Sequence, residues 1–431
     1  TSGPTFTGSG LNDLTITKEG SVAGDFRVKI SGINNATDSG KEGYWATPFR
    51  VGTYYWSAIA VNSAGRFVAG GESGYVSYSD DGITWATPFQ VGTSYWYAIA
   101  VNSSGRFVAG GPNGYISYSD DGINWVTPFR VGIYYWSAIA VNSAGRFVAV
   151  GESGYVSYSD DGINWVTPFR VGTYYWSAIA VNSAGRFVAG GPNGYVSYSD
   201  DGINWATPFR VGIYYWSAIA VNSSGRFVAV GSNAYISYSD DGITWATPFQ
   251  VSTSHWYAIA VNSSGRFVAV GYGGNITYSD DGINWVTPFQ VSTSHWYAIA
   301  VNSSGRFVAV GSNGYVSMSL LQDSIKISSN GGTTWGSDIP IPANEAISIT
   351  GFGIDILFGH VEGHTVGDYW SFTQGVMRGL AIKDSAGSEY FSAFNGEVTL
   401  KTLNATTVDA TTVNATVVDI KGKPPLLTKS L

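Results

Sequence analysis

Arginine, glutamine, tyrosine and histidine side chains recur at intervals of 40 residues along most of the chain. Aromatic rings stack on the apolar faces of sugars, and planar amide or guanidinium groups hydrogen bond to vicinal hydroxyls. These residue types at this spacing therefore predict glycan contacts that are repeated between copies. The candidates are Arg50, Tyr54, Tyr55, Gln90, Tyr95, Tyr97, Arg130, Tyr134, Tyr135, Arg170, Tyr174, Tyr175, Arg210, Tyr214, Tyr215, Gln250, His255, Tyr257, Gln290, His295 and Tyr297.

Three of these positions change together between copies. Arg50 is followed by Tyr54 and then by a serine at position 57, whereas Gln90 is followed by a serine and then by Tyr97. Copies that lack the tyrosine at the first position carry a tyrosine three residues later. We interpret this exchange as two versions of one small pocket.

The candidates belong to a repeat that begins at Trp45 and occurs seven times without insertion or deletion. A second tryptophan opens a Trp-x-Ala-Ile-Ala-Val-Asn run in every copy. A period of about 40 residues with four strand-like runs is typical of a β-propeller blade. The second tryptophans are Trp56, Trp96, Trp136, Trp176, Trp216, Trp256 and Trp296.

The first copy predicts four strands. Small alanines suit residues 56–62 to the innermost strand, and residues 66–70 and 75–79 form the next two strands. The fourth strand covers residues 85–91 and contains Pro88. Because proline is tolerated at a sheet edge, this strand should be the outermost one.

The last copy predicts how the ring closes. It breaks down at residues 317–320 and lacks a fourth strand, while residues 45–51 supply such a strand at the start of the repeats. We therefore expect the N-terminal strand to complete the last blade, which removes the open sheet edge. The fold class predicted is all-β, a seven-bladed β-propeller with 40-residue blades.

Differences between copies concentrate in two loops. One joins the fourth strand to the next blade, as in residues 49–57, and the other joins the second and third strands, as in residues 71–75. In a propeller these loops share one face, here called the variable face. The Asn-Ser-x-Gly-Arg and Asp-Asp-Gly turns occupy the opposite face and are almost unchanged. Tryptophans such as Trp56 are expected to pack between blades, and Arg66 to pair with aspartates of the opposite face.

The turn from Tyr78 to Trp85 resembles the Asp-box of sialidase-like propellers, from which it departs at Tyr78. We expect Asp80 to accept backbone N–H groups, Gly82 to adopt a left-handed conformation and Trp85 to insert into the sheet. In that family the Asp-box is scaffold and not catalytic.

Catalytic and metal sites are not indicated. The variable-face acids Glu72 and Glu152 lie two blades apart, which exceeds the ~5–9 Å that separates paired glycosidase carboxylates. The four histidines form no cluster, and the absence of cysteine excludes disulfides and thiolate ligands. We expect no catalytic residues, no metal and no cofactor.

The composition limits the partners. A net charge of −8 argues against nucleic acid, and 12% charged with 15% aromatic residues suits carbohydrate contact better. No apolar run is long enough to predict membrane insertion, and no signal-peptide pattern opens the sequence. The first residue is Thr1, which is consistent with a fragment or a processed chain.

Residues outside the repeats predict two further parts. Residues 1–40 and 323–375 alternate like strands and are expected to form one small β domain, split by a propeller over residues 41–322. Residues 376–431 include five-residue repeats such as TVDAT and TVNAT. Five-residue repeats of one chain are too short to bury an apolar stripe by themselves. We therefore expect a β-rich, fibrous oligomerisation segment in a homotrimer. A disordered tail is the alternative.

The segments GTTWGSDIPI, ISITG and GHTVGDYWSF resemble a module of phage and prophage tail-fibre proteins. The resemblance implies a virion location, in an extracellular tail fibre or baseplate, with other tail proteins as partners. Together with the variable face it favours a non-catalytic adhesin that binds host cell-surface polysaccharide or lipopolysaccharide multivalently. A structural or scaffolding propeller of the virion tail is the alternative, and an Asp-box glycosidase is a third possibility.

Overall fold

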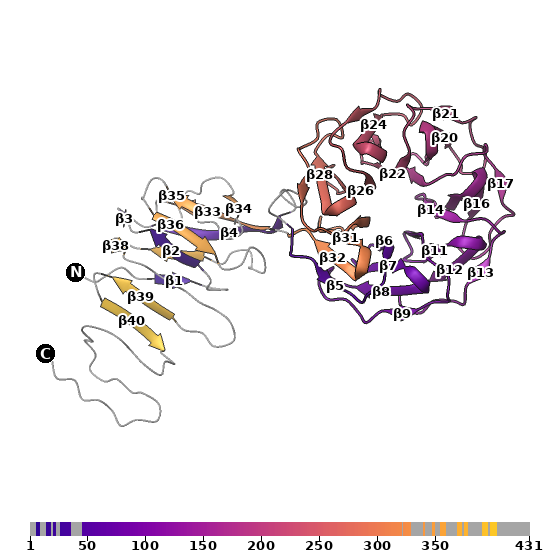
Figure 1. Cartoon of the computed structure of the whole chain (residues 1–431). Coiled ribbons are helices and arrows are strands. Elements are labelled where there is room, and N and C mark those ends of the chain that lie inside the picture. Colours follow the sequence, from indigo (N-terminus) through magenta and orange to yellow (C-terminus); the bar gives the residue numbers. More distant parts are fainter. Residues whose placement is uncertain are drawn as a thin grey trace. The chain divides into compact units, whose positions relative to one another are not determined.

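The computed structural model describes residues 45–320 in full and, on either side of them, the strands β1–β4 and β33–β40. The chain divides into two compact units, one of residues 36–321 and one of residues 1–35 with 322–431. Residues 36–321 form a ring of seven four-stranded antiparallel sheets (Figure 1). The predicted all-β seven-bladed propeller with 40-residue blades is confirmed.

Blades 1 to 6 each take four consecutive strands from β6 to β29, and blade 7 combines β30–β32 with β5. The innermost strands are β6 (Trp56–Val61), β10 (Ala98–Val101), β14 (Trp136–Val141), β18 (Ala178–Val181), β22 (Trp216–Val221), β26 (Trp256–Val261) and β30 (Trp296–Val301). The second strands are β7 (Phe67–Gly71), β11 (Phe107–Gly110), β15 (Phe147–Gly151), β19 (Phe187–Gly190), β23 (Phe227–Gly231), β27 (Phe267–Gly271) and β31 (Phe307–Gly311). The third strands are β8 (Tyr75–Ser79), β12 (Tyr115–Ser119), β16 (Tyr155–Ser159), β20 (Tyr195–Ser199), β24 (Tyr235–Ser239), β28 (Asn275–Ser279) and β32 (Tyr315–Met318).

The outermost strands contain only two residues each. They are β5 (Phe49–Arg50), β9 (Phe89–Gln90), β13 (Phe129–Arg130), β17 (Phe169–Arg170), β21 (Phe209–Arg210), β25 (Phe249–Gln250) and β29 (Phe289–Gln290). They are shorter than predicted because the proline before each one has no N–H to donate to the sheet. A 3-10 turn joins the second and third strands of each blade. These turns are η1 (Glu72–Gly74), η2 (Pro112–Gly114), η3 (Glu152–Gly154), η4 (Pro192–Gly194), η5 (Ser232–Ala234), η6 (Tyr272–Gly274) and η7 (Ser312–Gly314).

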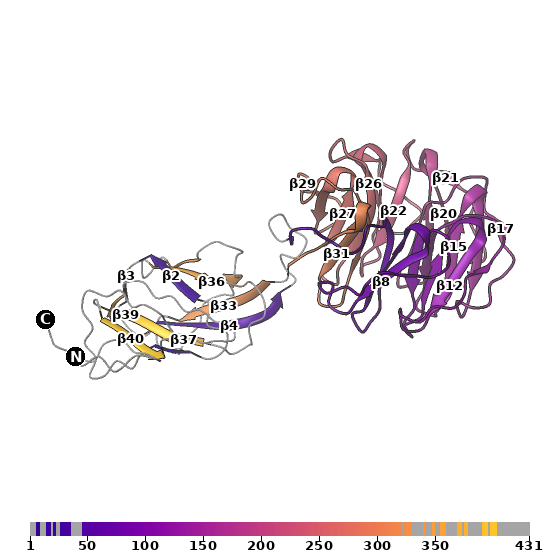
Figure 2. The ribbon, with the colours of Figure 1, turned by 60° about the horizontal axis from the view of Figure 1, so that its bottom comes forward.

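The ring closes as the sequence predicts. Strand β5 pairs antiparallel with β32, with Phe49 opposite Val316 and Arg50 opposite Tyr315. The N–H of Ala46 donates to the carbonyl of Met318 at 2.9 Å. The seventh blade therefore takes its outer strand from the start of the propeller, and its sheet edge is paired. Figure 2 shows the strands crossing the thickness of the ring, with the loops at its two faces.

The tryptophan that opens each innermost strand region forms the core between blades. All seven are fully buried. Trp136, for example, packs with Ala98, Val108 and Ile116 of blade 2 and with Phe147 of its own blade. Its indole N–H donates to the carbonyl of Val131 at 3.2 Å. The predicted packing between blades is confirmed.

The opposite face is held by a ring of charged contacts. Arg66 Nε donates to Asp80 Oδ1 at 2.6 Å, and its Nη1 donates to the carbonyl of Asp121 in blade 2 at 2.8 Å. The guanidinium also lies over the Tyr78 ring at 5.2 Å. Equivalent arginines in blades 2 to 5 make the same contacts. The predicted pairing of Arg66 is confirmed.

The expected role of Asp80 is wrong. Its neighbour Asp81 accepts the backbone N–H groups of Ile83 and Thr84, each at 2.7 Å, whereas Asp80 is used by Arg66. Ser79 orients the turn, because its hydroxyl donates to the Asp81 carboxylate and accepts the N–H of Gly82. Gly82 has the expected left-handed φ of +77°, and an added Cβ would lie 2.8 Å from a methyl group of Val308.

The second unit consists of three sheets. Their orders are β1-β37-β4-β33-β34, β2-β36-β35 and β3-β38-β39-β40. The strands before the propeller are β1 (Phe6–Gly8), β2 (Leu14–Lys18), β3 (Gly20–Val22) and β4 (Phe26–Asn35). Those after it are β33 (Gln322–Ser328), β34 (Ile339–Pro340), β35 (Ile347–Ile349), β36 (Ile354–Phe358), β37 (Tyr369–Phe372), β38 (Gly375–Met377), β39 (Tyr390–Phe394) and β40 (Glu397–Thr402).

Each sheet of this unit combines strands from before and after the propeller. In one of them, Val28 of β4 lies opposite both Ile327 and Trp370. Residues 403–431, which contain the predicted five-residue repeats, lie outside the described residues. The homotrimer therefore stays a prediction.

We predict that Trp136→Ala lowers the free energy of unfolding by about 3–5 kcal/mol, because it leaves a cavity between two blades. Chemical denaturation followed by tryptophan fluorescence measures the loss. Ile133→Ala, three residues away and 67% exposed, is the matched control and should change the free energy by less than about 0.5 kcal/mol. Equal losses for the two variants would show that the tryptophan does not hold neighbouring blades together.

We predict that acid destabilises the propeller as the pH falls from about 4 towards 2. Burial raises the pKa of Asp121, but hydrogen bonds from Asn124, Ile123 and Ser119 outweigh it and hold the pKa at about 2. A carboxyl group whose pKa is depressed on folding stabilises the fold above its unfolded pKa of about 3.9, and this contribution is lost below it. The pKa is also about 2 for Asp161, Asp201 and Asp281.

Urea unfolding at pH 5, 4, 3 and 2 measures this dependence, and the urea midpoint should fall at each step. Asp121→Asn should flatten the curve, because one titrating group is removed. A midpoint that is independent of pH over this range would contradict the prediction.

Candidate ligand-binding face

The two loops of the variable face are hydrogen bonded to each other in each blade. In blade 1 the N–H of Val91 donates to the carbonyl of Gly74 at 2.8 Å, and Gln90 Nε2 donates to the carbonyl of Ser73 at 2.9 Å. Ser73 has a φ of +55°, and the equivalent positions hold serine, asparagine or glycine. Gly74 permits this approach, because an added Cβ would lie 2.4 Å from the carbonyl oxygen of Gly92.

The arginines and the first tyrosines of the variable face form stacks on the third strands. Tyr155 has the Tyr134 ring on one side, at 3.4 Å between centroids, and the Arg170 guanidinium on the other, at 5.2 Å. Tyr195 lies in the same way between Tyr174 and Arg210. We call these groups the outer stacks. Their aromatic faces are occupied by the protein itself.

The remaining outer stacks are incomplete. Tyr54 stacks on Tyr75 and Tyr214 on Tyr235, at 3.5 and 3.4 Å. Arg50 lies over Tyr315 and Arg130 over Tyr115, at 4.8 and 4.9 Å. In blade 6 an asparagine takes the central place, and Asn275 Nδ2 donates to Ser254 Oγ at 3.3 Å. The glutamine side chains of Gln90, Gln250 and Gln290 instead donate to the carbonyls of residues 73, 233 and 273.

The central tyrosines of these stacks are not among the predicted site residues. Their positions hardly vary between copies, and the prediction relied on variation. The replacement by Asn275, in a copy that has both Ser254 and Gln290, is the signal that could have identified them. The positions of Ser254, Asn275 and Gln290 correspond to the three members of one outer stack.

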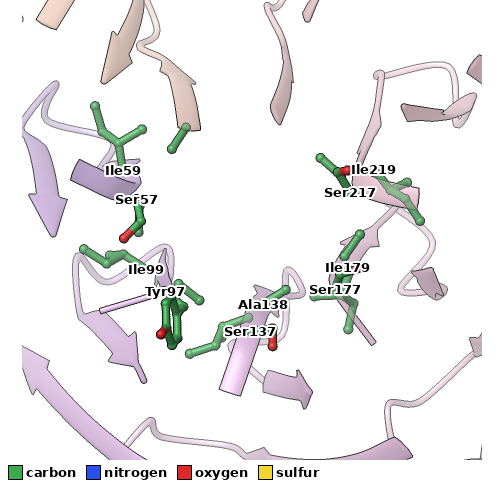
Figure 3. A pocket seen from close by; sticks show the side chains of 16 residues that line it. Ser57, Ile59, Tyr97, Ile99, Ser137, Ala138, Ser177, Ile179, Ser217 and Ile219 are labelled. Carbon is green, nitrogen blue, oxygen red and sulfur yellow. The ribbon is translucent and has the colours of Figure 1, made fainter. Parts of the chain in front are cut away.

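The other candidates gather where the central channel opens on the variable face, a region that we call the channel mouth. Here the innermost strands of blades 1 to 5 surround an open cavity of about 170 Å³. Figure 3 shows its side chains arranged around an open centre, with Ser57, Tyr97, Ser137, Ser177 and Ser217 beside alanines and isoleucines of the same strands.

Exposed tyrosine rings occur at this mouth, where Tyr97 lines the cavity and Tyr135 lies 6.5 Å from Tyr97 between ring centroids. Tyr55, Tyr97, Tyr135 and Tyr215 each expose 38–39% of their surface. Tyr97 stacks on Tyr95 with 4.8 Å between centroids, and Tyr55 lies 6.3 Å from Tyr297. Tyr175 is less exposed and accepts a hydrogen bond from Ser137 Oγ at 2.6 Å. Ser57 and Ser177 donate to the carbonyls of Trp96 and Trp216, at 2.7 and 2.6 Å.

The interpretation of two versions of one pocket is wrong. Tyr54 contacts Tyr75 in an outer stack, whereas Tyr97 lines the channel mouth. In the first copy the two positions are 54 and 57, and the fully buried Trp56 lies between them in the sequence. The tyrosine therefore lies in an outer stack in some copies and at the channel mouth in others.

The two histidines differ in their surroundings. His295 Nδ1 accepts the N–H of Gly273 at 2.9 Å, and its ring stacks on Tyr272 at 4.3 Å. The equivalent His255 is exposed. Tyr272 is 51% exposed and is a further aromatic residue of the variable face that the sequence analysis did not select.

The chemistry of the channel mouth is that of hydrogen bonding and stacking. Burial, together with the Glu72 carboxylate and the Tyr97 phenol, raises the pKa of Tyr95 to about 12, so this phenol stays protonated. Glu72 and Glu152 accept the backbone N–H groups of Tyr55 and Tyr135, at 3.3 and 3.4 Å. The described part of the chain holds no group of three or more His, Asp or Glu placed to bind a metal ion.

Comparison with known proteins supports the fold. No family model matches the chain, and no curated protein matches it. One similar solved structure is "YCF48 bound to D1 peptide", 15% identical, with a TM-score of 0.54 over 68% of this chain and 97% of that chain. Another is the WD40 β-propeller domain of Doa1, 13% identical, with a TM-score of 0.51 over 70% of this chain and 96% of that chain.

At these identities the likeness shows a shared fold. Each helix in the described residues is a single 3-10 turn, and none has the length and apolar character of a membrane span.

We predict that Tyr95 ionises only near pH 12. A phenol whose pKa is raised on folding stabilises the fold below its unfolded pKa of about 10, and this contribution is lost as the pH rises towards 12. NMR of protein labelled at tyrosine Cζ measures the titration, with Tyr95→Phe to assign the signal. Ionisation at about pH 10 would mean that this ring is in contact with water.

Proposed function

We propose that the propeller is a non-catalytic carbohydrate-binding module that contacts its ligand through the variable face. One observation carries the proposal: the exposed ring of Tyr97 lines a cavity with serine hydroxyls at the channel mouth, and the exposed ring of Tyr135 lies beside it. Aromatic walls with a few polar groups are the usual composition of a small-ligand site. On the opposite face, by contrast, arginines and aspartates pair with each other.

The biological setting of this proposal comes from the sequence. The resemblance of residues 5–34 and 323–373 to tail-fibre modules supports a receptor-binding part of a phage tail fibre. Its ligand is then a polysaccharide or lipopolysaccharide of the host surface. A homotrimer formed through residues 376–431 brings three propellers to one surface, and linked weak sites gain avidity without new contacts.

A scaffold that binds protein is the second candidate function. The similar structure "YCF48 bound to D1 peptide" is a complex of that protein with a peptide, and for this chain the candidate partner is a protein segment at the variable face. A virion tail protein is the partner that this candidate predicts. The third possibility is a glycosidase, which is disfavoured because Glu72 and Glu152, the acids of the variable face, both accept backbone N–H groups.

We predict that the full chain binds bacterial surface glycans on an array, and that Tyr55→Ala with Tyr135→Ala and Tyr215→Ala weakens binding at least about tenfold. Each lost stacking contact is worth roughly 0.5–1.5 kcal/mol, and 1.4 kcal/mol corresponds to tenfold. Ser63→Ala with Ser143→Ala, at exposed positions of the opposite face, is the matched control and should bind like the unchanged chain.

Other outcomes identify the other functions. Binding of no glycan, with co-purification of one virion protein that the tyrosine variant loses, supports the scaffold. Release of free sugar from an arrayed glycoside supports the glycosidase. Either result would replace the proposed function.

A further inference from the structure

The channel mouth is not seven-fold symmetric. The second residue of the innermost strand region lines the cavity in blades 1 to 5, and across the seven blades it is a tyrosine in some and a serine in others. The tyrosines are Tyr257 in blade 6, Tyr297 in blade 7 and Tyr97 in blade 2. The serines are Ser57 in blade 1 and Ser137, Ser177 and Ser217 in the consecutive blades 3 to 5.

The tyrosines form a continuous aromatic side. Tyr297 lies 5.4 Å from Tyr257 and 6.3 Å from Tyr55, measured between ring centroids. The His295 ring lies edge-on to Tyr297 at 6.1 Å. Rings from blades 6, 7 and 1 therefore contact one another, and we call this group the aromatic arc. The stacked Tyr95 and Tyr97 continue the aromatic surface on blade 2.

The other side of the mouth carries hydroxyl groups. The cavity is lined mainly by blades 1 to 5, and in blades 3 to 5 a serine stands at the position that is a tyrosine in blades 2, 6 and 7 (Figure 3). Tyrosines also lie two residues before these serines, so this side carries both hydroxyl groups and rings. Ser137 and Ser177 donate their protons to oxygen atoms of the neighbouring blades. Their lone pairs remain as acceptors, so this edge is suited to the hydroxyl groups of a ligand.

The charges of the variable face favour a neutral ligand. Among residues 45–320, its arginines are held in the outer stacks, over the tyrosines of the third strands. Glu72 and Glu152 lie beside the mouth, where they accept the N–H groups of Tyr55 and Tyr135. An anionic ligand at the mouth would therefore meet carboxylates without a guanidinium partner, which costs free energy.

We propose that each propeller binds one neutral saccharide end at the channel mouth, on the ring axis, and not one ligand per blade. The apolar face of the sugar ring lies on the aromatic arc, and its hydroxyl groups face the serines of blades 3 to 5. The inference rests on the proposed function and specifies its site. Multivalency then comes from the number of propellers.

The repeats supply variants that exchange natural residues. Tyr297→Ser and Ser177→Tyr each introduce the residue that other blades carry at the same position, so the fold should be retained. The first variant removes the centre of the aromatic arc, and the second fills the hydroxyl side. Tyr174→Ala, in an outer stack, is the control.

The test titrates the full chain with three trisaccharides, followed by calorimetry and ligand-observed NMR. They are tri-N-acetylchitotriose, its cationic de-acetylated form and the anionic trigalacturonate. We expect a stoichiometry of one per chain, with trigalacturonate binding at least about tenfold more weakly than the neutral sugar. Tyr297→Ser and Ser177→Tyr should each weaken binding at least about tenfold, and Tyr174→Ala should leave it unchanged.

A stoichiometry of several sugars per chain, a loss of binding in Tyr174→Ala, preference for trigalacturonate or binding of none of the three would overturn the axial site. The glycan array separates this failure from that of the proposed function. If arrayed glycans bind but the axial test fails, only the axial site is wrong. If no arrayed glycan binds, the carbohydrate-binding function itself is wrong.

Discussion

The packing of one blade against the next is the constraint on which this propeller depends. Each blade opens with a fully buried tryptophan that contacts apolar residues of the preceding blade, so a single blade cannot bury its own core. The same requirement at the seam is met by β5, which completes the last blade. Arg66 and its equivalents add a polar link between neighbouring blades on the opposite face. Together these contacts explain why so much of each copy cannot vary.

The fold could be predicted from the sequence because its causes are periodic. A 40-residue period, a proline within the predicted outer strand and an incomplete last copy were sufficient for the blade order and for the ring closure. Local side-chain choices were harder to predict. Asp80 and Asp81 are adjacent and identical in type, and only the geometry set by Ser79 decides which carboxylate faces the turn.

The site could be predicted in part. Variation between copies indicated two loops expected on one face, and the structure shows that these loops are hydrogen bonded to each other. It did not show which varying residues share a place, because Tyr54 and Tyr97 are close in the repeat but lie on opposite sides of a buried tryptophan. The tyrosines at the centre of the outer stacks were missed because they scarcely vary. A residue that contacts two variable neighbours can stay constant when both neighbours stack on its two ring faces.

Near-identical blades do not provide a single asymmetric set of catalytic residues, but they do provide a regular binding surface. Identical copies would give seven equivalent sectors around the channel. Specificity for a ligand must then come from the few positions at which the copies differ. The position that faces the channel is such a place, because serine and tyrosine fit the same backbone but give either a hydroxyl or an aromatic wall. Exchanges at this one position alter the mouth without disturbing the buried tryptophans below it. The scaffold and the ligand preference can therefore change independently.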